Sequence, residues 1–163
     1  MEIKIVAVGK LKERYWAEAA SEYRKRLRPY AHVSIIEVKD RPLAKRSTSE
    51  IDPAQAGLVL KQEAQDLEKE IGQRDYLVCL TPEGKMYSSE ELAEFLRWLE
   101  SSGQSTLTMV IGGTLGIDPG LKAKAELLLS LSRMTFPHQL SRVMLLEQLY
   151  RAFKILRHEP YHR

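Results

Sequence analysis

The sequence predicts an α/β fold in which a parallel β-sheet is flanked by helices on both faces. Three observations predict it. Short apolar runs rich in β-branched residues alternate along the chain with longer segments of helical spacing, an order typical of parallel sheets. The 163 residues suit one domain over 1–163 that can bury a sizeable core. With 44% hydrophobic and 29% charged residues, the composition is that of an ordinary soluble globular protein.

The first half of the chain predicts two strands and two helices. The run "IKIVAVG" is short and β-branched, as expected for a buried strand, whereas an apolar residue every four positions from Tyr15 to Leu27 indicates a helix. Proline and glycine mark the ends of these segments. The expected elements are a strand over 3–9, a helix over 15–27 ended by Pro29, a strand over 33–38, a polar loop over 39–55, and a helix over 54–71 ended by Gly72.

The second half continues the alternation. The segment "SSEELAEFLRWLES" opens with a serine cap and an acid three residues later, which is a helix-start signature. Asp118 followed by Pro119 predicts a second helix start. The expected elements are a strand over 75–80, a turn over 81–84, a helix over 88–101, a strand over 107–113, a helix ending near 129, a short strand over 129–135, and a last helix over 141–156.

Several features indicate a cytoplasmic protein. A single cysteine, Cys79, excludes an internal disulfide framework, and its apolar surroundings favour a buried, inert thiol. The segment "MEIKIVAVGKLKE" lacks the pattern of a signal peptide. No apolar run is long enough to span a membrane.

Basic residues gather in two regions although the net charge is only +3. Residues 10–30 carry seven lysines and arginines against three acids, and residues 133–163 carry six against two. Localised positive charge of this kind is typical of a polyanion-binding surface, while solvated helix faces are the alternative. We therefore expect the groups at Lys10–Arg14 and Arg24–Arg28 to form a surface that binds a polyanion.

The most distinctive local feature is a glycine-rich turn after the fourth strand, "VIGGTLGIDPGL". Glycines at a strand-to-helix turn permit positive φ and let a ligand approach the backbone. The spacing matches neither a dinucleotide fingerprint nor a P-loop, and a tight connection without a ligand is the alternative. Histidine and cysteine spacings give no metal site, and no nucleophile elbow is present. Ligands of such sheets bind at the carboxyl ends of the strands, so the loops after residues 9, 81, 112 and 135 are the ones expected to form a site.

Three stretches together resemble one protein family. They are "VAVGKLKERYW", "IGGTLGI" and "FPHQLSRVMLLEQLYRAFKILRHEPYHR". Their combination resembles the RlmH family, bacterial methyltransferases of the SPOUT superfamily that act on pseudouridine in large-subunit ribosomal RNA. The resemblance extends over essentially the whole chain. Thr81 departs from it, since many members have aspartate there, and the polar segment 41–55 looks longer than usual.

The resemblance implies a fold, a cofactor and an oligomeric state. The C-terminal part is expected to form a deep trefoil knot, which general topology rules would exclude because knots are rare. The cofactor is expected to be S-adenosylmethionine (SAM), with no metal, and the protein a homodimer whose active sites borrow groups from the partner subunit. The expected cofactor contacts are Leu80, Gly112, Gly113, Leu131, Ser132, Arg133, Met134, Thr135 and Phe136.

The implied reaction transfers a methyl group to N3 of a pseudouridine in a loop of 23S ribosomal RNA. The N3 imide must lose its proton to attack, so a base or a cation near the nascent anion assists. A loop or flipped-out nucleotide is expected because N3 is hidden in a paired helix. The candidates are His162 as base or proton relay, Arg163 and Arg142 for the anion or phosphate, Tyr161 for stacking or hydrogen bonding, and His138 beside the base.

Each assignment has an alternative. The alternative for His138 is to hold the cofactor loop by hydrogen bonds. The alternative for Arg142 is to balance the charge of Glu147, and that for Tyr161 is to pack at an interface. The apolar face of the last helix, including Tyr150 and Phe153, is expected to help form the dimer interface, with a purely internal face as its rival. At the level of function, the alternative is a non-catalytic ribosome- or RNA-binding protein with a vestigial cofactor pocket.

Overall fold

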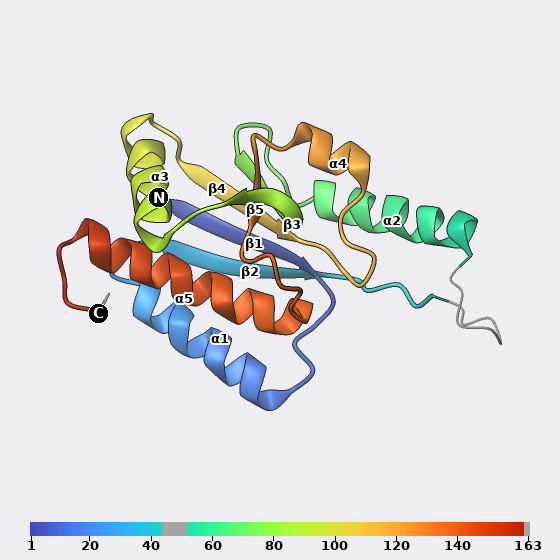
Figure 1. Ribbon diagram of the computed structural model, residues 1–163, viewed down its shortest axis with the longest axis horizontal. Helices are drawn as coiled ribbons and strands as arrows, with labels where there is room; N and C mark the ends of the chain where they lie inside the picture. The colour runs from blue at the N-terminus through green and yellow to red at the C-terminus, as the bar shows by residue number, and fades with distance from the viewer. Residues whose placement is uncertain (44–51, 162–163) are drawn as a thin grey trace.

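The structure is a computed structural model that describes residues 1–43 and 52–161. Within these residues the chain forms five strands and five helices, which alternate as predicted (Figure 1). Of the loop predicted over 39–55, residues 44–51 lie outside the described residues. The elements are β1 Glu2–Val8, α1 Arg14–Leu27, β2 His32–Val38, α2 Pro53–Glu68, β3 Tyr76–Met86, α3 Ser89–Ser101, β4 Thr106–Ile111, α4 Pro119–Lys124, β5 Leu127–Ser130 and α5 His138–Leu156.

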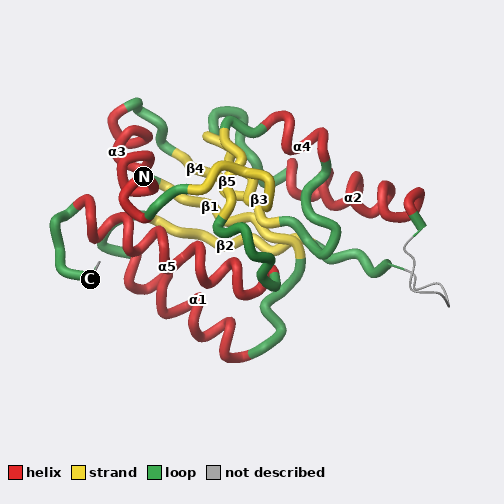
Figure 2. The backbone as a smooth tube through the Cα atoms, in the orientation of Figure 1, coloured by secondary structure: helices red, strands yellow, loops and turns green. Residues whose placement is uncertain are grey.

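The five strands form one sheet in the order β2-β1-β4-β3-β5, and every neighbouring pair is parallel. The predicted fold class, a parallel sheet flanked by helices, is therefore confirmed. Helices α1, α3 and α5 cover one face of the sheet, and α2 and α4 cover the other (Figures 1 and 2). Because all strands run the same way, their carboxyl ends meet at one edge.

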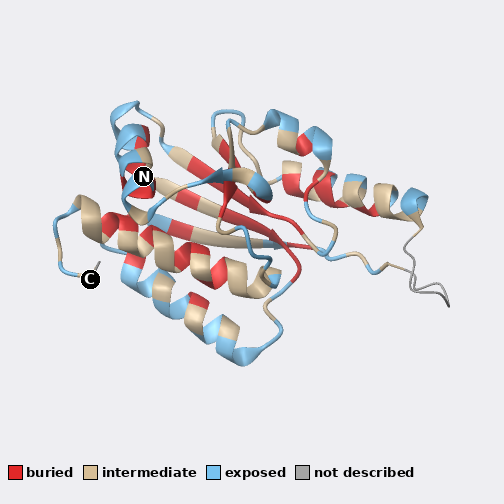
Figure 3. Ribbon diagram, in the orientation of Figure 1, coloured by how far each residue is buried: buried red, intermediate tan, exposed pale blue. Residues whose placement is uncertain are grey.

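The core follows the two-residue period of the strands. In β1, Ile3 and Ile5 point toward α1, α3 and α5, while Val6 and Val8 point toward α2 and α4. Both sets are buried, which explains why β1 reads as a continuous apolar run (Figure 3). Cys79 in β3 is fully buried, and burial raises the pKa of its thiol to about 11, as expected for an inert thiol.

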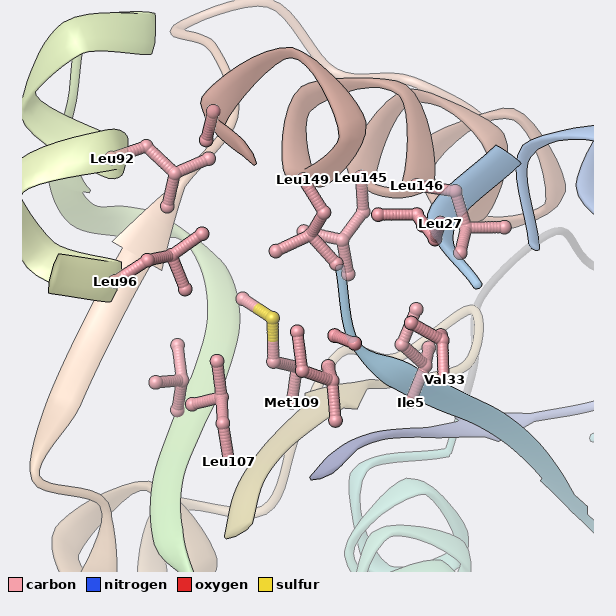
Figure 4. Packing of buried hydrophobic residues seen from close by; sticks show 14 of the residues in the cluster. Ile5, Leu27, Val33, Leu92, Leu96, Leu107, Met109, Leu145, Leu146 and Leu149 are labelled. Carbon is pink, nitrogen blue, oxygen red and sulfur yellow. The ribbon is translucent and has the colours of Figure 1, made fainter. Parts of the chain in front are cut away.

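The apolar face of α5 lies inside the protomer. Leu145, Leu146 and Leu149 pack between the sheet and the neighbouring helices (Figure 4), and Phe153 is fully buried with them. The expectation that Phe153 forms a dimer interface is therefore wrong, because one chain alone already covers it. The rival interpretation of an internal face is confirmed here, although Tyr150 remains partly exposed.

Residues 81–84, predicted as a turn, belong instead to the long strand β3. The pairing of β3 with β5 shifts register between Leu80 and Lys85, so the strand is irregular but unbroken. Gly84 makes this possible, since a Cβ there would lie 2.6–2.7 Å from backbone atoms of Leu128 and Leu129. Residues 81–84 are therefore strand rather than turn because β5 packs closely against Gly84.

The region before α5 also differs from the prediction. The helix expected to end near 129 stops at Lys124, and the short strand is Leu127–Ser130 rather than 129–135. A brief apolar run fits a helix or a strand equally well by periodicity, and pairing with β3 selects the strand. Residues 131–137 are consequently a loop, and α5 begins at His138, three residues earlier than expected.

None of the helices within the described residues is long and apolar enough to cross a membrane.

Candidate active site

Part of strand β3 and the loops after β4 and β5 meet at the carboxyl edge of the sheet and enclose a pocket of about 500 Å³. We call this cavity the loop pocket. Its walls are residues 80–83 of β3, residues 112–117 after β4, and residues 130–137 after β5, and the first turn of α5 closes it. The volume lies within the range of small-molecule and cofactor sites.

The residues expected to contact a cofactor come together in this pocket, although they are distant in the sequence. Arg133 is the exception, because its side chain is exposed and does not line the cavity. His138, one of the candidates for chemistry, also lines it. The predicted residues that form the walls are Leu80, Gly112, Gly113, Leu131, Ser132, Met134, Thr135 and Phe136.

The glycine-rich loop forms a tight turn whose backbone faces the cavity. Gly113 accepts a hydrogen bond of 3.0 Å from the amide of Gly116, which adopts a φ of +83°. A Cβ on Gly112 would collide with the carbonyl of Gly116. Asp118 then caps α4 through its side chain, which accepts from the Gly120 amide at 2.8 Å, as predicted. The glycines thus serve a tight connection and also give the pocket a wall of backbone.

The loop after β5 is held by local hydrogen bonds. The hydroxyl of Ser130 donates to the carbonyl of Ser132 at 2.9 Å, and the hydroxyl of Ser132 accepts from the Met134 amide at 2.9 Å. These bonds fix the backbone while the Met134 side chain stays exposed at the rim. The loop therefore presents backbone groups and apolar side chains, among them Leu131, Met134 and Phe136, to the pocket.

One ion pair stands at the pocket. Lys122 of α4 donates to the carboxylate of Glu83. This bond, helped by one from Thr81, lowers the pKa of Glu83 to about 2. The positive charge of Lys122 is therefore matched by a carboxylate that stays ionised, and Thr81 supports that carboxylate with a hydrogen bond.

Arg142 lies beneath the site rather than on its surface. Its side chain is fully buried, and it donates to Glu37 at 2.7 Å and to the carbonyl of Gly9 at 3.0 Å. Burial lowers the pKa of the guanidinium, while the Glu37 carboxylate opposes this effect. The alternative in which Arg142 balances Glu147 is wrong, since Arg142 pairs with Glu37 and Glu147 binds Arg151.

The buried position also argues against a direct contact of Arg142 with RNA. The guanidinium joins α5 to the end of β1 and to the edge strand β2. Arg142 lies one turn after His138 on α5, so this cross-link fixes the start of the helix that closes the loop pocket. We therefore assign Arg142 a positioning role.

His138 begins α5 at the rim of the loop pocket. Within residues 1–43 and 52–161, no hydrogen bond of its imidazole is found that would support the alternative of a loop-holding residue. Nearby, the side chain of Gln139 accepts from the Lys12 amide at 3.3 Å, which brings the loop before α1 next to this end of α5.

Tyr161 lies at the other end of α5. Its hydroxyl contacts Glu147 at 3.3 Å, its ring stands edge-on to Tyr150 with centroids 4.8 Å apart, and the Arg151 guanidinium lies 4.9 Å above the ring. Burial, followed by a hydrogen bond with Tyr23, raises the pKa of Tyr161 to about 12.

Tyr161, the last residue that the structure describes, is therefore remote from the loop pocket of its own chain. At 1.5 Å per residue, the helix rises about 18 Å between His138 and Tyr150, against which Tyr161 packs. The loop pocket includes the first turn of α5, whereas Tyr161 lies beyond the other end of this helix, whose course Figure 1 shows. The other two tail residues proposed for chemistry, His162 and Arg163, lie outside the described residues.

A buried carboxylate behind the glycine loop escaped the sequence analysis. Glu63 of α2 is 3% exposed, accepts from the Arg41 amide at 3.3 Å, and has a raised pKa because of its burial. A Cβ on Gly113 would lie 3.3 Å from its Oε2. The spacing of Val59, Glu63 and Leu67 was a usable signal, since residues four apart share one helix face and both neighbours are buried.

Comparison with known proteins agrees with this architecture. A family model described as "Predicted SPOUT methyltransferase" matches residues 1–162.

Among curated proteins, one from Carboxydothermus hydrogenoformans is 48% identical over the full length of both chains. One from Desulforamulus reducens is also 48% identical, over 100% of this chain and 99% of its own. One from Streptococcus pyogenes is 42% identical over both full lengths. All three are named "Ribosomal RNA large subunit methyltransferase H". The resemblance found in the sequence is thereby confirmed, and the chain belongs to the SPOUT methyltransferase family.

Proposed function

We propose that this protein is a SAM-dependent methyltransferase that modifies N3 of a pseudouridine in a loop of 23S ribosomal RNA, in the cytoplasm. The observation that carries the proposal is the convergence of three separate stretches, all expected to contact the cofactor, on the loop pocket. The names of the full-length relatives supply the substrate class. The position and atom of methylation rest on the family resemblance.

The residues of the loop pocket fit SAM. Its sulfonium is a cation, so a suitable pocket offers backbone carbonyls and apolar walls without an unpaired lysine. The glycine loop supplies backbone, Leu80 and Phe136 supply apolar surface, and Lys122 is neutralised by Glu83. When bound, SAM supplies a methyl group on positively charged sulfur for in-line transfer to the nucleophilic nitrogen.

The protein's own groups have to orient the base and handle the N3 proton. We assign His138 to the wall against which the base lies, because it stands at the rim of the pocket. In the tail, His162 is the proposed base or proton relay and Arg163 the proposed partner of the anion or a phosphate. Tyr161 is proposed to stack on the base or to hydrogen-bond with it. Arg142 holds the first turns of α5 in place for this task.

A second copy of the chain is needed for this arrangement. Tyr161 packs about 18 Å along α5 from His138, so Tyr161 is remote from the pocket of its own protomer. We propose a homodimer in which the tail of one subunit completes the loop pocket of the other. We also propose the trefoil knot of the family for the C-terminal part, on the family resemblance.

The test is mass spectrometry of 23S ribosomal RNA from cells with and without the protein, joined to calorimetric titration of the purified protein with SAM. The proposal expects a methylated pseudouridine that disappears with the protein, and SAM binding in the micromolar range. An unchanged RNA signal, or a protein that binds RNA but does not bind SAM, would instead favour a non-catalytic RNA-binding protein.

A further inference from the structure

A second concavity, of about 350 Å³, lies where α1 ends and β2 begins. We call it the basic hollow. The buried residues Ala31 and Val33 form its floor. Its polar lining is Ser21, Arg24, Lys25, Arg28 and His32. Among the described residues that line it, none is acidic.

The helix repeat explains why these side chains gather. Ser21, Arg24, Lys25 and Arg28 are spaced i, i+3, i+4 and i+7, so they share one face of α1. That face borders the edge strand β2, whose first residue, His32, adds a further polar group. The hollow is thus a continuous basic surface built from two elements.

The charges of the hollow are not neutralised by neighbours. Arg26, on another face of α1, donates to Glu22 at 2.8 Å and lies over the Tyr23 ring. By contrast, no ion pair or side-chain hydrogen bond joins Arg24, Lys25 or Arg28 to any residue in the described part of the chain. Three exposed cations around a concave floor favour an anion with several oxygens, and a phosphate group matches this chemistry.

The position of the hollow relative to the tail gives it a role in the proposed reaction. Tyr161 hydrogen-bonds with Tyr23, on the flank of α1 that faces α5. The hollow lies on the other flank, about one helix diameter away, roughly 10–12 Å. Both lie at the C-terminal end of α1, whereas the start of α1 lies near the loop pocket (Figure 1).

We propose that the basic hollow binds a backbone phosphate of the RNA substrate, and that it serves the loop pocket of the partner subunit that receives its neighbouring tail. The inference rests on the proposed function, because it takes the tail to act on the partner's pocket. Positive groups at both ends of α1, separated by about 20 Å, suit an extended nucleic-acid strand better than a small free anion.

The first experiment measures RNA affinity as a function of salt. The double variant Arg24→Ala/Arg28→Ala is compared with Lys61→Ala/Arg97→Ala, which removes the same charge from α2 and α3. The hollow variant should bind 23S RNA fragments about tenfold more weakly and lower the slope of log K against log salt by about 0.7, the value for one lost phosphate contact on a single strand. The affinity for SAM should not change. Equal RNA affinities and slopes of the two double variants would overturn the proposal.

The second experiment tests which pocket the hollow serves, using mixed dimers. Thr135→Arg, at an exposed position in the pocket wall, disables one loop pocket, as verified by loss of SAM binding. When the hollow variant and Thr135→Arg are on different subunits, the intact pocket faces an intact hollow and activity should be retained. When both changes are on one subunit, the remaining pocket faces the altered hollow and activity should fall about tenfold.

The outcomes separate this inference from the proposed function. Equal activity of the two mixed dimers would overturn the assignment to the partner's pocket. A wild-type protein that neither binds SAM nor methylates RNA would instead contradict the proposed function. The comparison of RNA affinities between the two double variants would still test the phosphate site.

Discussion

The guanidinium of Arg142 donates to the carboxylate of Glu37 at 2.7 Å, joining α5 to the edge strand β2 across 105 residues of sequence. The arginine is fully buried, whereas the Glu37 side chain is 29% exposed. A charge in this position is stabilised by its partner and by the Gly9 carbonyl, and it becomes costly when either partner is lost.

We predict that Arg142→Met lowers the free energy of unfolding by about 3 kcal/mol, because it removes a buried charge pair and leaves a partly buried carboxylate without its partner. Urea denaturation measures the change. The salt dependence of RNA binding should stay as in the wild type, since the side chain does not reach the surface. A reduced salt slope in a fully folded variant would show that Arg142 contacts phosphate after all.

Gly112→Ala should weaken SAM binding by about tenfold or more, because the new Cβ collides with the Gly116 carbonyl and shifts the wall of the pocket. Calorimetric titration measures the affinity. Gly116→Ala is the matched control: it strains a positive φ, but its Cβ points into open space. If the two alanine variants bind SAM equally, close backbone approach at Gly112 is not what shapes the site.

Deletion of Tyr161, His162 and Arg163 should lower turnover about 10²- to 10⁴-fold, the contribution of a positioned acid or base, while SAM affinity stays close to that of the wild type. Single-turnover methylation of ribosomal RNA and SAM titration give the two quantities. His162→Ala and Arg163→Ala then divide the loss between proton transfer and anion binding. Loss of SAM affinity on deletion would place the tail in the cofactor pocket instead.

Lys122→Met should raise the pKa of Glu83 from about 2 toward its usual value near 4.5, because the lysine that stabilises the carboxylate is gone. A carboxylate with a lowered pKa in the folded state adds stability above pH 4.5, and this stability is lost as the pH falls toward 2. NMR titration of the Glu83 carboxyl follows the shift. An unchanged Glu83 titration in Lys122→Met would exclude the ion pair as its cause.

Much of the fold could be predicted because its signals are local. The strands β1 and β4 are short apolar runs ended by glycine or loops, and the capping box of α3 is visible in the sequence and present in the structure, where Ser88 and Glu91 exchange hydrogen bonds. The convergence of the pocket loops also follows from sequence, because the carboxyl ends of parallel strands share an edge.

The differences arise from contacts between distant residues. The turn predicted at 81–84 became strand because β5 packs against Gly84, and no local pattern records that neighbour. Arg142 shares its helix face with Leu145, Leu146 and Leu149. Its spacing therefore predicted a buried side chain, whereas its charge predicted an exposed one. The inward position is tolerated because Glu37 and the Gly9 carbonyl, both distant in the sequence, bind the guanidinium.

The backbone wall of the loop pocket has a consequence for how this protein tolerates change. The wall there is formed largely by the backbone of the glycine loop. We therefore expect the identity of side chains such as Thr114 and Leu115 to matter less for ligand binding than the number of residues between β4 and α4. A single inserted residue in that turn should therefore be more damaging than most replacements within it.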